Sequence, residues 1–106
     1  MKINIASNEI IHFIGIGGIG MSGLAQIMNN MGFAIQGSDL SKNKNTERLI
    51  KKGIKVYFGH KQKNLKKTTM VVISSAVKET NKELMAAKNK KIPIFKRGEM
   101  LANIVS

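Results

Sequence analysis

The feature that most constrains this chain is an apolar run, Ile10 to Ile14, that passes directly into the glycine-rich segment G-I-G-G-I-G. Gly15, Gly17 and Gly20 form the pattern G-x-G-x-x-G, and apolar residues at helical spacing follow it. A strand, a glycine loop and a helix in this order build the first unit of a βαβ fold. We therefore expect an α/β domain with a parallel sheet.

The rest of the chain repeats this alternation of strand-like and helix-like segments. Residues 33–36, 54–58, 70–73 and 92–95 indicate four more short strands after the strand at 10–14. Helices are expected around 24–31, over 45–52, over 80–89 and from near 98 onwards, with a polar connection over 61–69 that has room for one helical turn. Because crossover helices join parallel strands with a right-handed turn, the predicted fold is a Rossmann-like open parallel sheet of about five strands with helices on both faces.

Individual side chains support the expected helices. The buried face of the first helix has the spacing i, i+3, i+4, i+7 and is expected to consist of Leu24, Ile27, Met28 and Met31. Gly32 can end that helix in a left-handed conformation. Leu49 and Ile50 are expected to face inward from the second helix. Thr80 and Glu83 have the spacing of a capping box, which predicts that Glu83 caps the start of the third helix.

Each glycine of the loop has a separate expected task. Gly15 allows a tight turn, Gly17 lets the backbone touch a diphosphate, and Gly20 lets the helix pack closely on the sheet. Gly18 adds a second bare backbone position, and the helix N-terminus offers N–H groups to an anion. We expect Gly17→Val to abolish anion binding and to leave the fold largely intact. In the alternative interpretation, the glycines only make a tight turn.

Small or polar residues follow each later strand, at the edge where open α/β sheets bind ligands. In chain order they are Ser38 and Asp39, His60, the turn Ser74-Ser75-Ala76, and Arg97. Asp39 stands about 20 residues after the glycine loop, where dinucleotide-binding folds place an acid for the ribose, so glycines and acid alone favour NAD. His60 is either a ligand contact or a solvent-exposed loop residue, and Arg97 is an anion clamp or a surface charge. His12, inside the first strand, is expected to be structural.

Composition limits the classes of partner. The net charge is +12, yet sixteen of the eighteen basic residues are Lys and only Arg48 and Arg97 are Arg, whereas base readout relies on Arg. We therefore expect a lysine-rich solvated surface and no nucleic-acid partner. No apolar run reaches the roughly 20 residues that span a bilayer, so no membrane partner is expected. The chain has no Cys, which suits a cytoplasmic location, and 106 residues suit one domain.

No catalytic constellation is visible in the sequence. With no Cys, one Asp and two His at unrelated positions, the chain offers neither a nucleophile with its base nor a metal-ligand cluster. It also lacks the pattern G-x-x-x-x-G-K-[ST] that holds the phosphates of ATP in P-loop proteins. The expected function is therefore binding, with no catalytic residue and no metal.

Five motifs occur in a fixed order along the chain. They are H-F-I-G-I-G-G-I-G-M-S-G-L-A (12–25), G-S-D (37–39), G-H (59–60), V-V-I-S-S-A-V (71–77) and I-P-I-F-K-R-G-E-M-L-A (92–102). In this order and spacing they resemble the N-terminal domain of the Mur ligase family, and within it the UDP-N-acetylmuramate:L-alanine ligases. The similarity runs from Ile11 to Ala102.

The resemblance implies a ligand other than NAD. In this family the Rossmann-like N-terminal domain holds the UDP part of UDP-N-acetylmuramic acid. By matching position, the loop that would hold the diphosphate consists of Gly15, Ile16, Gly17, Gly18, Ile19 and Gly20. Ser38 and Asp39 would face the nucleoside, and His60 and the Ser74-Ser75-Ala76 turn would line the uridine site. Arg97 matches the segment R-x-E-M-L, where it would contact the ligand or serve the structure.

The resemblance also implies a reaction of peptidoglycan biosynthesis, and through it a role in cell-wall biogenesis, cell shape and cell division. ATP with Mg²⁺ would phosphorylate the muramoyl carboxylate, and the amine of L-alanine would then displace phosphate to form an amide. The family's ATPase domain and amino-acid-binding domain are missing from these 106 residues. We therefore expect one substrate-binding domain over 1–106 that has no cofactor of its own and is inactive alone. The alternatives are an NAD(H)-binding domain of a dehydrogenase or regulator, and the related ligase that recycles murein peptides.

Overall fold

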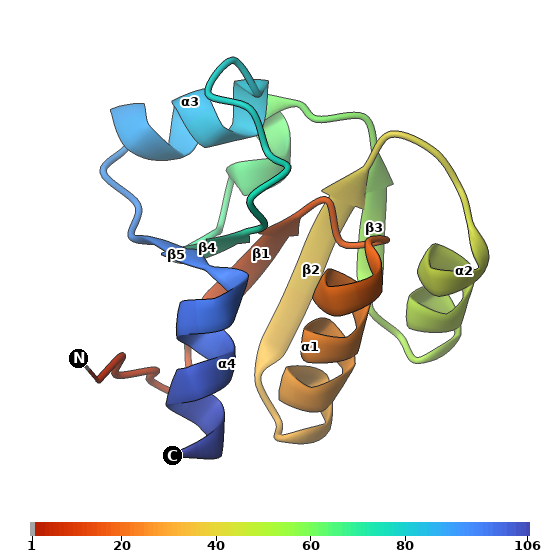
Figure 1. Cartoon of the computed structure of the whole chain (residues 1–106). Coiled ribbons are helices and arrows are strands. Elements are labelled where there is room, and N and C mark those ends of the chain that lie inside the picture. Colours follow the sequence, from red (N-terminus) through yellow and green to blue (C-terminus); the bar gives the residue numbers. More distant parts are fainter. Residues whose placement is uncertain (1) are drawn as a thin grey trace.

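A computed structural model describes residues 2–106 (Figure 1). The elements follow one another as β1 (Ile10–Ile14), α1 (Ile19–Asn30), β2 (Ala34–Asp39), α2 (Lys44–Lys51), β3 (Lys55–Phe58), the 3-10 helix η1 (Gln62–Leu65), β4 (Met70–Ile73), α3 (Lys82–Asn89), β5 (Ile94–Lys96) and α4 (Arg97–Val105). All strand pairs are parallel, and their order is β3-β2-β1-β4-β5. The predicted Rossmann-like α/β fold is confirmed.

The strand order creates a switch point beside β1. The chain moves outward from β1 through β2 to β3, then crosses back to β4 on the other side of β1. Ile14, the last residue of β1, pairs with Ser38 on one side and Ile73 on the other. In such sheets the loops after the two strands at the switch point turn to opposite faces and leave a crevice between them.

Each face of the sheet has its own apolar cluster, because successive residues of a strand point to opposite faces. Ile11 and Phe13 of β1 pack with residues of α1, α2 and α4, whereas Ile14 packs with residues of η1 and α3. Helices thus cover both faces, with α1, α2 and α4 on one and α3 with η1 on the other (Figure 1). Within residues 2–106, no helix is long and apolar enough to cross a membrane.

Several predicted boundaries were wrong, and among the strands β2 differs most. It continues to Asp39, three residues beyond the predicted end, because Gly37 and Ser38 pair with β1 and β3 in the middle of the sheet. A Cβ on Gly37 would lie 2.6 Å from the Ile16 Cβ and 2.7 Å from the Phe13 carbonyl oxygen. A glycine that indicates a turn in the sequence is therefore required inside the strand, where it makes room for the loop after β1.

The predicted inward faces of two helices were partly wrong. Ile27 and Met31 are about half-exposed, and the buried face of α1 instead contains Met21, Leu24, Ala25 and Met28. Ile50 of α2 is also half-exposed, whereas Leu49 is buried as expected. Gly32 has a φ of +96°, which confirms the left-handed end of α1. Since α1 begins at Ile19, its buried stripe starts one turn earlier than the sequence analysis assumed.

The predicted capping box at α3 was also wrong. Asn81 caps this helix, and its side-chain oxygen accepts hydrogen bonds from the backbone N–H groups of Glu83 and Leu84. The carboxylate of Glu83 is completely buried and turns toward the sheet. This replacement matters for the site, because Glu83 becomes the centre of a polar cluster beneath the sheet edge.

Candidate ligand-binding cleft

A cleft of about 650 Å³ lies at the switch point of the sheet. Its walls come from the residues at or just after the carboxyl ends of all five strands and from the first turn of α1. The lining residues are Ile14, Gly15, Gly18, Ile19, Gly20, Met21, Asp39, Leu40, His60, Ser74, Ala76, Val77, Lys78, Thr80, Asn81 and Arg97. Five separate segments of the chain, all named in advance from the sequence, therefore meet in one crevice of ligand size.

The glycine loop begins with a tight turn at Gly15, in a backbone conformation that glycine adopts more easily than other residues. Gly15 has a φ of +83°, and its N–H and that of Ile16 both donate to the carbonyl oxygen of Ser38 at 2.9 Å. The side chain of Ile16 is completely buried, against the bare Gly37. Gly15 thus has the expected task, whereas Ile16 supports the loop from behind and does not line the cleft.

Gly17, which was expected to let the backbone touch a diphosphate, lies behind the cleft instead. Its N–H donates to Asp39 Oδ2 at 2.7 Å, and its carbonyl oxygen accepts from Asn45 Nδ2 at 2.9 Å. A Cβ there would lie 2.7 Å from Asp39 Oδ2 and 2.8 Å from Thr46 Cγ2. Gly17 is buried and does not line the cleft. The expectation that Gly17→Val leaves the fold largely intact stays a prediction, but the new Cβ meets the side chains of Asp39 in β2 and Thr46 in α2, so these must shift at a cost in stability.

The first turn of α1 is the part of the loop that is open to a ligand. Gly18, Ile19 and Gly20 are exposed at the cleft. The N–H of Gly18 donates to the carbonyl oxygen of Gly15 at 3.1 Å, whereas the N–H groups of Ile19 and Gly20, in the first turn of the helix, have no intrahelical partner. No acidic side chain lies in this turn and no side chain caps it. A Cβ on Gly18 would come no closer than 3.5 Å to any atom. The backbone around Gly18 can therefore meet an anion at the positive end of the helix dipole.

Arg97 adds a full positive charge at the same place. It is the first residue of α4, and its side chain lies on Gly20, where a Cβ would come within 2.9 Å of Nε and 3.2 Å of Cζ. Gly20 thus leaves room for a guanidinium, in addition to any role in packing the helix on the sheet. Lys78, from the loop after β4, lines the same cleft. Two cations and a helix N-terminus make this wall strongly attractive to a phosphate.

Asp39 lines the cleft, but its carboxylate also holds the surrounding backbone. Oδ2 accepts from the N–H of Gly17, and Oδ1 accepts from the N–H of Leu40 at 2.8 Å. The carbonyl oxygen of Asp39 accepts from the N–H of Gly59 at 2.8 Å. Asp39 therefore connects the glycine loop, the end of β2 and the loop that carries His60.

Beneath the cleft, Glu83 collects polar groups from four segments of the chain. Its Oε1 accepts from His12 Nε2 at 2.8 Å and from the Ser38 hydroxyl at 2.5 Å. Its Oε2 accepts from Asn64 Nδ2 at 2.6 Å and from the N–H of Lys61 at 3.2 Å. We call Glu83 with His12, Ser38 and Asn64 the buried polar cluster. Burial raises the pKa of Glu83, but hydrogen bonds from His12, Ser38 and Asn64 lower it, and the net shift is downward.

The hydrogen bonds determine which nitrogen of His12 carries the proton. Gln36 Nε2 donates to the carbonyl oxygen of Asn64 at 2.9 Å, so this atom is the amide nitrogen. The same nitrogen lies 2.8 Å from His12 Nδ1, which must therefore accept. His12 is then neutral, with its proton on Nε2 and directed at Glu83. The expected structural role of His12 is confirmed, since it is fully buried and engaged on both sides.

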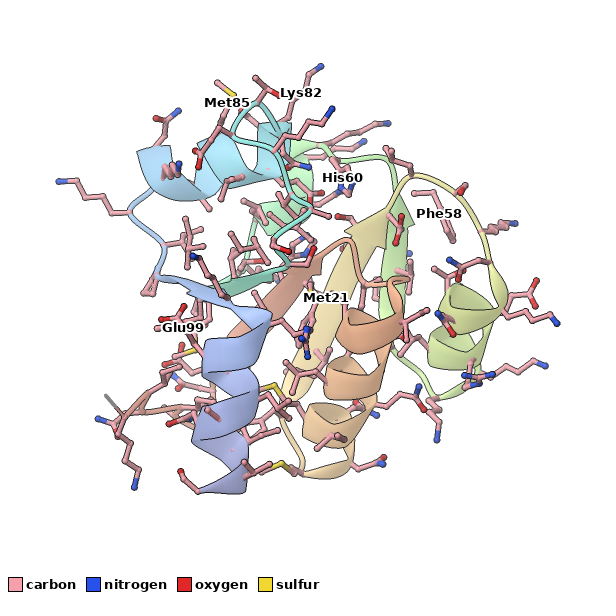
Figure 2. All side chains as sticks on the ribbon, viewed as in Figure 1. Met21, Phe58, His60, Lys82, Met85 and Glu99 are labelled. Atoms are coloured by element: carbon pink, nitrogen blue, oxygen red, sulfur yellow. The ribbon has the colours of Figure 1, made fainter. Side chains whose placement is uncertain are left out.

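His60 joins the buried polar cluster to the cleft. Its Nδ1 lies 2.8 Å from the Ser38 hydroxyl and 3.6 Å from Glu83 Oε1, and the side chain is 16% exposed. Figure 2 shows His60 between α3 and the sheet edge, with Met21 at the start of α1 below it. Ser38 itself is completely buried and does not line the cleft. Ser38 was expected to face the nucleoside, but it lies beneath His60 and is not open to the cleft.

The turn after β4 contributes more of the cleft than the sequence indicated. Ser74 and Ala76 line the cleft, whereas Ser75 is exposed and lies outside the lining. The same loop adds Lys78 and Asn81, which the sequence analysis did not single out. The loop continues to the start of α3, so most of its length, except Ser75 and Glu79, lines the crevice.

The buried polar cluster was missed as a unit, although one signal was available. His12 and Gln36 are polar residues at inner positions of two strands, and they pair directly in the sheet. Polar residues facing each other inside a core require polar partners from the covering layer. Here these partners are Asn64 on η1 and Glu83 on α3. Within residues 2–106, no three His, Cys, Asp or Glu side chains are grouped to hold a metal ion.

Comparison with known proteins agrees with this geometry. The model described as the Mur ligase family, catalytic domain, matches residues 10–106. The UDP-N-acetylmuramate--L-alanine ligase of Pelagibacter ubique is 65% identical over 106 residues, which are all of this chain and 23% of that protein. The chain thus spans less than a quarter of this curated relative.

Two solved structures share the fold of the chain. The UDP-N-acetylmuramate-alanine ligase from Thermotoga maritima matches with a TM-score of 0.87 and 32% identity, over 91% of this chain and 22% of that one. The UDP-N-acetylmuramate:L-alanyl-gamma-D-glutamyl-meso-diaminopimelate ligase from Neisseria meningitides matches with a TM-score of 0.83 and 32% identity, over 89% of this chain and 30% of that one. Proteins named for two different ligase activities therefore share this part of the fold.

Proposed function

Because this chain belongs to the Mur ligase family, we propose that its cleft binds the UDP part of UDP-N-acetylmuramate. One observation carries the proposal: the open first turn of α1, the guanidinium of Arg97 and the ends of the central strands meet in one cleft. The proposed binding domain comprises residues 1–106. An NAD-binding role has no comparable support, since no relative reported above is named as a dehydrogenase.

The diphosphate lies on the wall formed by the glycine loop and Arg97. Ile19 and Gly20 offer backbone N–H groups, while the N–H of Gly18 donates to the carbonyl oxygen of Gly15 at 3.1 Å. Arg97 offers a planar donor set beside them. Gly15 shapes the turn, while Ile16 and Gly17 hold the loop from behind. The phosphate charges thus meet a helix dipole and a guanidinium without first displacing an acidic cap.

The nucleoside lies toward the ends of β2 and β3, where Asp39 and His60 line the cleft. Ser74 and Ala76 line the same cleft from the loop after β4. Ser38 supports His60 from below, and Ser75 shapes the turn next to Ser74. These residues offer both hydrogen-bond donors and acceptors, as a ribose and a uracil require.

In the whole protein, we propose, this domain presents the muramoyl carboxylate for ATP-dependent joining to L-alanine. The 65% identity to a protein named for that activity favours it over the murein-peptide ligase. The described residues show no metal-ligand cluster, and the sequence has no P-loop, so no ATP or Mg²⁺ step is assigned to them. ATP, Mg²⁺ and L-alanine would bind elsewhere in a longer protein. A substrate that is a nucleotide sugar suits a cytoplasmic reaction in peptidoglycan biosynthesis, with its consequences for cell division.

Calorimetric titration tests the ligand. We expect saturable binding of UDP-N-acetylmuramate and of UDP, at two salt concentrations, and no binding of NAD. Binding of UDP that disappears with moderate salt would indicate mere attraction to the charge of +12 and would contradict the proposal. Binding of NAD in place of UDP would assign the cleft to a dinucleotide.

A pair of glycine variants tests the location. Gly18→Val adds a side chain at the mouth of the loop, where its Cβ comes no closer than 3.5 Å to a neighbouring atom, an ordinary contact distance. The backbone there has φ −65° and ψ 155°, which Val adopts readily. We expect UDP affinity to fall by about tenfold or more, because bulk covers charge-assisted N–H donors. Gly23→Val is the matched control, since Gly23 also has no atom near a Cβ but lies outside the cleft. Equal affinities for the two variants would place the ligand elsewhere.

A further inference from the structure

The buried polar cluster contains a hydrogen-bond chain that ends at the cleft. The Ser38 hydroxyl lies between Glu83 Oε1, at 2.5 Å, and His60 Nδ1, at 2.8 Å. An ionised carboxylate only accepts hydrogen bonds, so the single hydroxyl hydrogen of Ser38 points to Glu83. The Ser38 oxygen must then accept from His60, which places a proton on Nδ1. The negative charge of Glu83 thereby determines the tautomer of His60 through the hydroxyl of Ser38, without a direct hydrogen bond to the ring.

Glu83 also holds the backbone on both sides of His60. Its Oε2 accepts from the N–H of Lys61, the next residue in the chain. Asn64 Nδ2 donates both to Glu83 Oε2 and to the carbonyl oxygen of Gly59, the preceding residue. Gly59 has a φ of +104°, so the loop turns sharply just before His60. The ring is therefore held by its own hydrogen bond and by those of its two neighbours.

The other ring nitrogen of His60 reaches the cleft. Among the hydrogen bonds of residues 2–106, none involves His60 Nε2, and no buried side-chain nitrogen in that range lacks a partner. Nε2 is therefore accessible to solvent, and the side chain lines the cleft. With the proton on Nδ1, a neutral His60 presents Nε2 as a hydrogen-bond acceptor.

We propose that Glu83 and Ser38 are positioning residues that make His60 an acceptor at the nucleoside side of the cleft. The proposal rests on the function proposed above and adds to it a rule of specificity: the ligand atom that meets His60 carries a hydrogen. In a uridine nucleotide this hydrogen belongs to a ribose hydroxyl or to the imide N–H of uracil. A ligand that offers only an acceptor there loses this hydrogen bond and leaves Nε2 unpaired.

The first test needs no ligand, so it stands even if UDP does not bind. The ¹⁵N chemical shifts of the two histidine rings, measured at about pH 8 where imidazoles are ordinarily neutral, show which nitrogen of each is protonated. We expect Nδ1–H for His60 and Nε2–H for His12. In Ser38→Ala, His60 should change toward the Nε2–H form while His12, an internal control in the same spectrum, keeps its tautomer. A proton on Nε2 of His60 in the unaltered chain, or no change in Ser38→Ala, overturns the proposal.

The second test measures coupling between Ser38 and His60 in UDP binding. Ser38→Ala should weaken UDP binding by about threefold to tenfold, and the same change in a His60→Ala background should have almost no further effect. Ser41→Ala, an exposed serine outside the cleft, is the matched control. An equal loss from Ser38→Ala in both backgrounds would show a merely structural role and overturn the proposal.

Two analogues identify the hydrogen that His60 accepts. If it is a ribose hydroxyl, the effect of Ser38→Ala disappears with 2′,3′-dideoxy-UDP. If it is the uracil imide, the effect disappears with CDP, whose ring nitrogen at that position accepts instead of donating. Either result supports the proposal, and an effect that persists with both analogues overturns it.

Discussion

Replacing Glu83 by Gln should destabilise the chain far more than its conservative size suggests. The carboxylate is completely buried and accepts four hydrogen bonds, from His12, Ser38, Asn64 and the N–H of Lys61. A Gln side chain has the same shape but only one accepting oxygen. The amide nitrogen must therefore face two donors, whichever way the group is turned.

The magnitude follows from the donors that cannot adapt. If the amide nitrogen replaces Oε1, it faces His12 Nε2–H, and His12 cannot change tautomer because Gln36 donates to its Nδ1. If it replaces Oε2, it faces the N–H of Lys61 and Asn64 Nδ2, which also donates to a carbonyl oxygen. A buried donor without a partner costs about 1 to 3 kcal/mol, so we expect a loss of about 2 to 4 kcal/mol.

Urea denaturation followed by circular dichroism measures this loss. For a chain of this size, a loss of about 3 kcal/mol moves the unfolding midpoint by about 2 M urea. Glu79→Gln is the matched control, because Glu79 is an exposed carboxylate paired only with Lys88, and its replacement should cost about 0.5 kcal/mol or less. Similar midpoints for the two variants would refute the reasoning that Glu83 satisfies four buried donors.

Three further predictions test the packing and the charge of the site. Gly37→Ala should destabilise the chain by about 2 kcal/mol or more, because the added Cβ meets the Phe13 carbonyl oxygen at 2.7 Å; an unchanged thermal midpoint would contradict this. Gly17→Val should lower the free energy of unfolding, measured in urea, by about 1 to 3 kcal/mol, whereas Gly18→Val should leave it nearly unchanged. A larger loss in Gly18→Val than in Gly17→Val would contradict the described conformation of the loop. Because the pKa of Glu83 is lowered in the folded chain, its contribution is present above the unfolded value of about 4.3 and is lost as the pH falls through the lower folded value. Acid titration of unfolding should therefore show a loss of stability in that window that Glu83→Gln lacks, and parallel curves for both chains would argue against an ionised Glu83.

Much of the fold was predictable because it depends on local patterns. The strand Met70–Ile73 and the region of the glycine loop follow from apolar runs and from glycines that only certain turns need. It was also predictable that the ends of the strands lie close together, since parallel strands place their carboxyl ends at one edge of the sheet. For this reason Asp39, His60, Ser74 and Arg97 could be assigned to one cleft before the structure was known.

Which residues of a motif line the cleft and which lie behind it was not predictable. Gly17 and Gly18 are neighbours of identical composition, yet one is buried against Asp39 and Thr46 and the other is open. Ser38 and Asp39 are also neighbours, but alternation along a strand sends Ser38 under the sheet edge and leaves Asp39 in the cleft. These differences depend on contacts between residues far apart in the chain.

The amino-acid sequence by itself determined the class of fold, the glycine turn between β1 and α1 and the family of the chain, because each is a property of residue order and spacing. The tertiary structure alone decided the partners of Glu83. A residue with the spacing of a helix cap became the acceptor for His12, Ser38 and Asn64. The physical reason is that a buried polar group must find its partners in space, and the sheet brings them together from strands and helices that no local pattern connects.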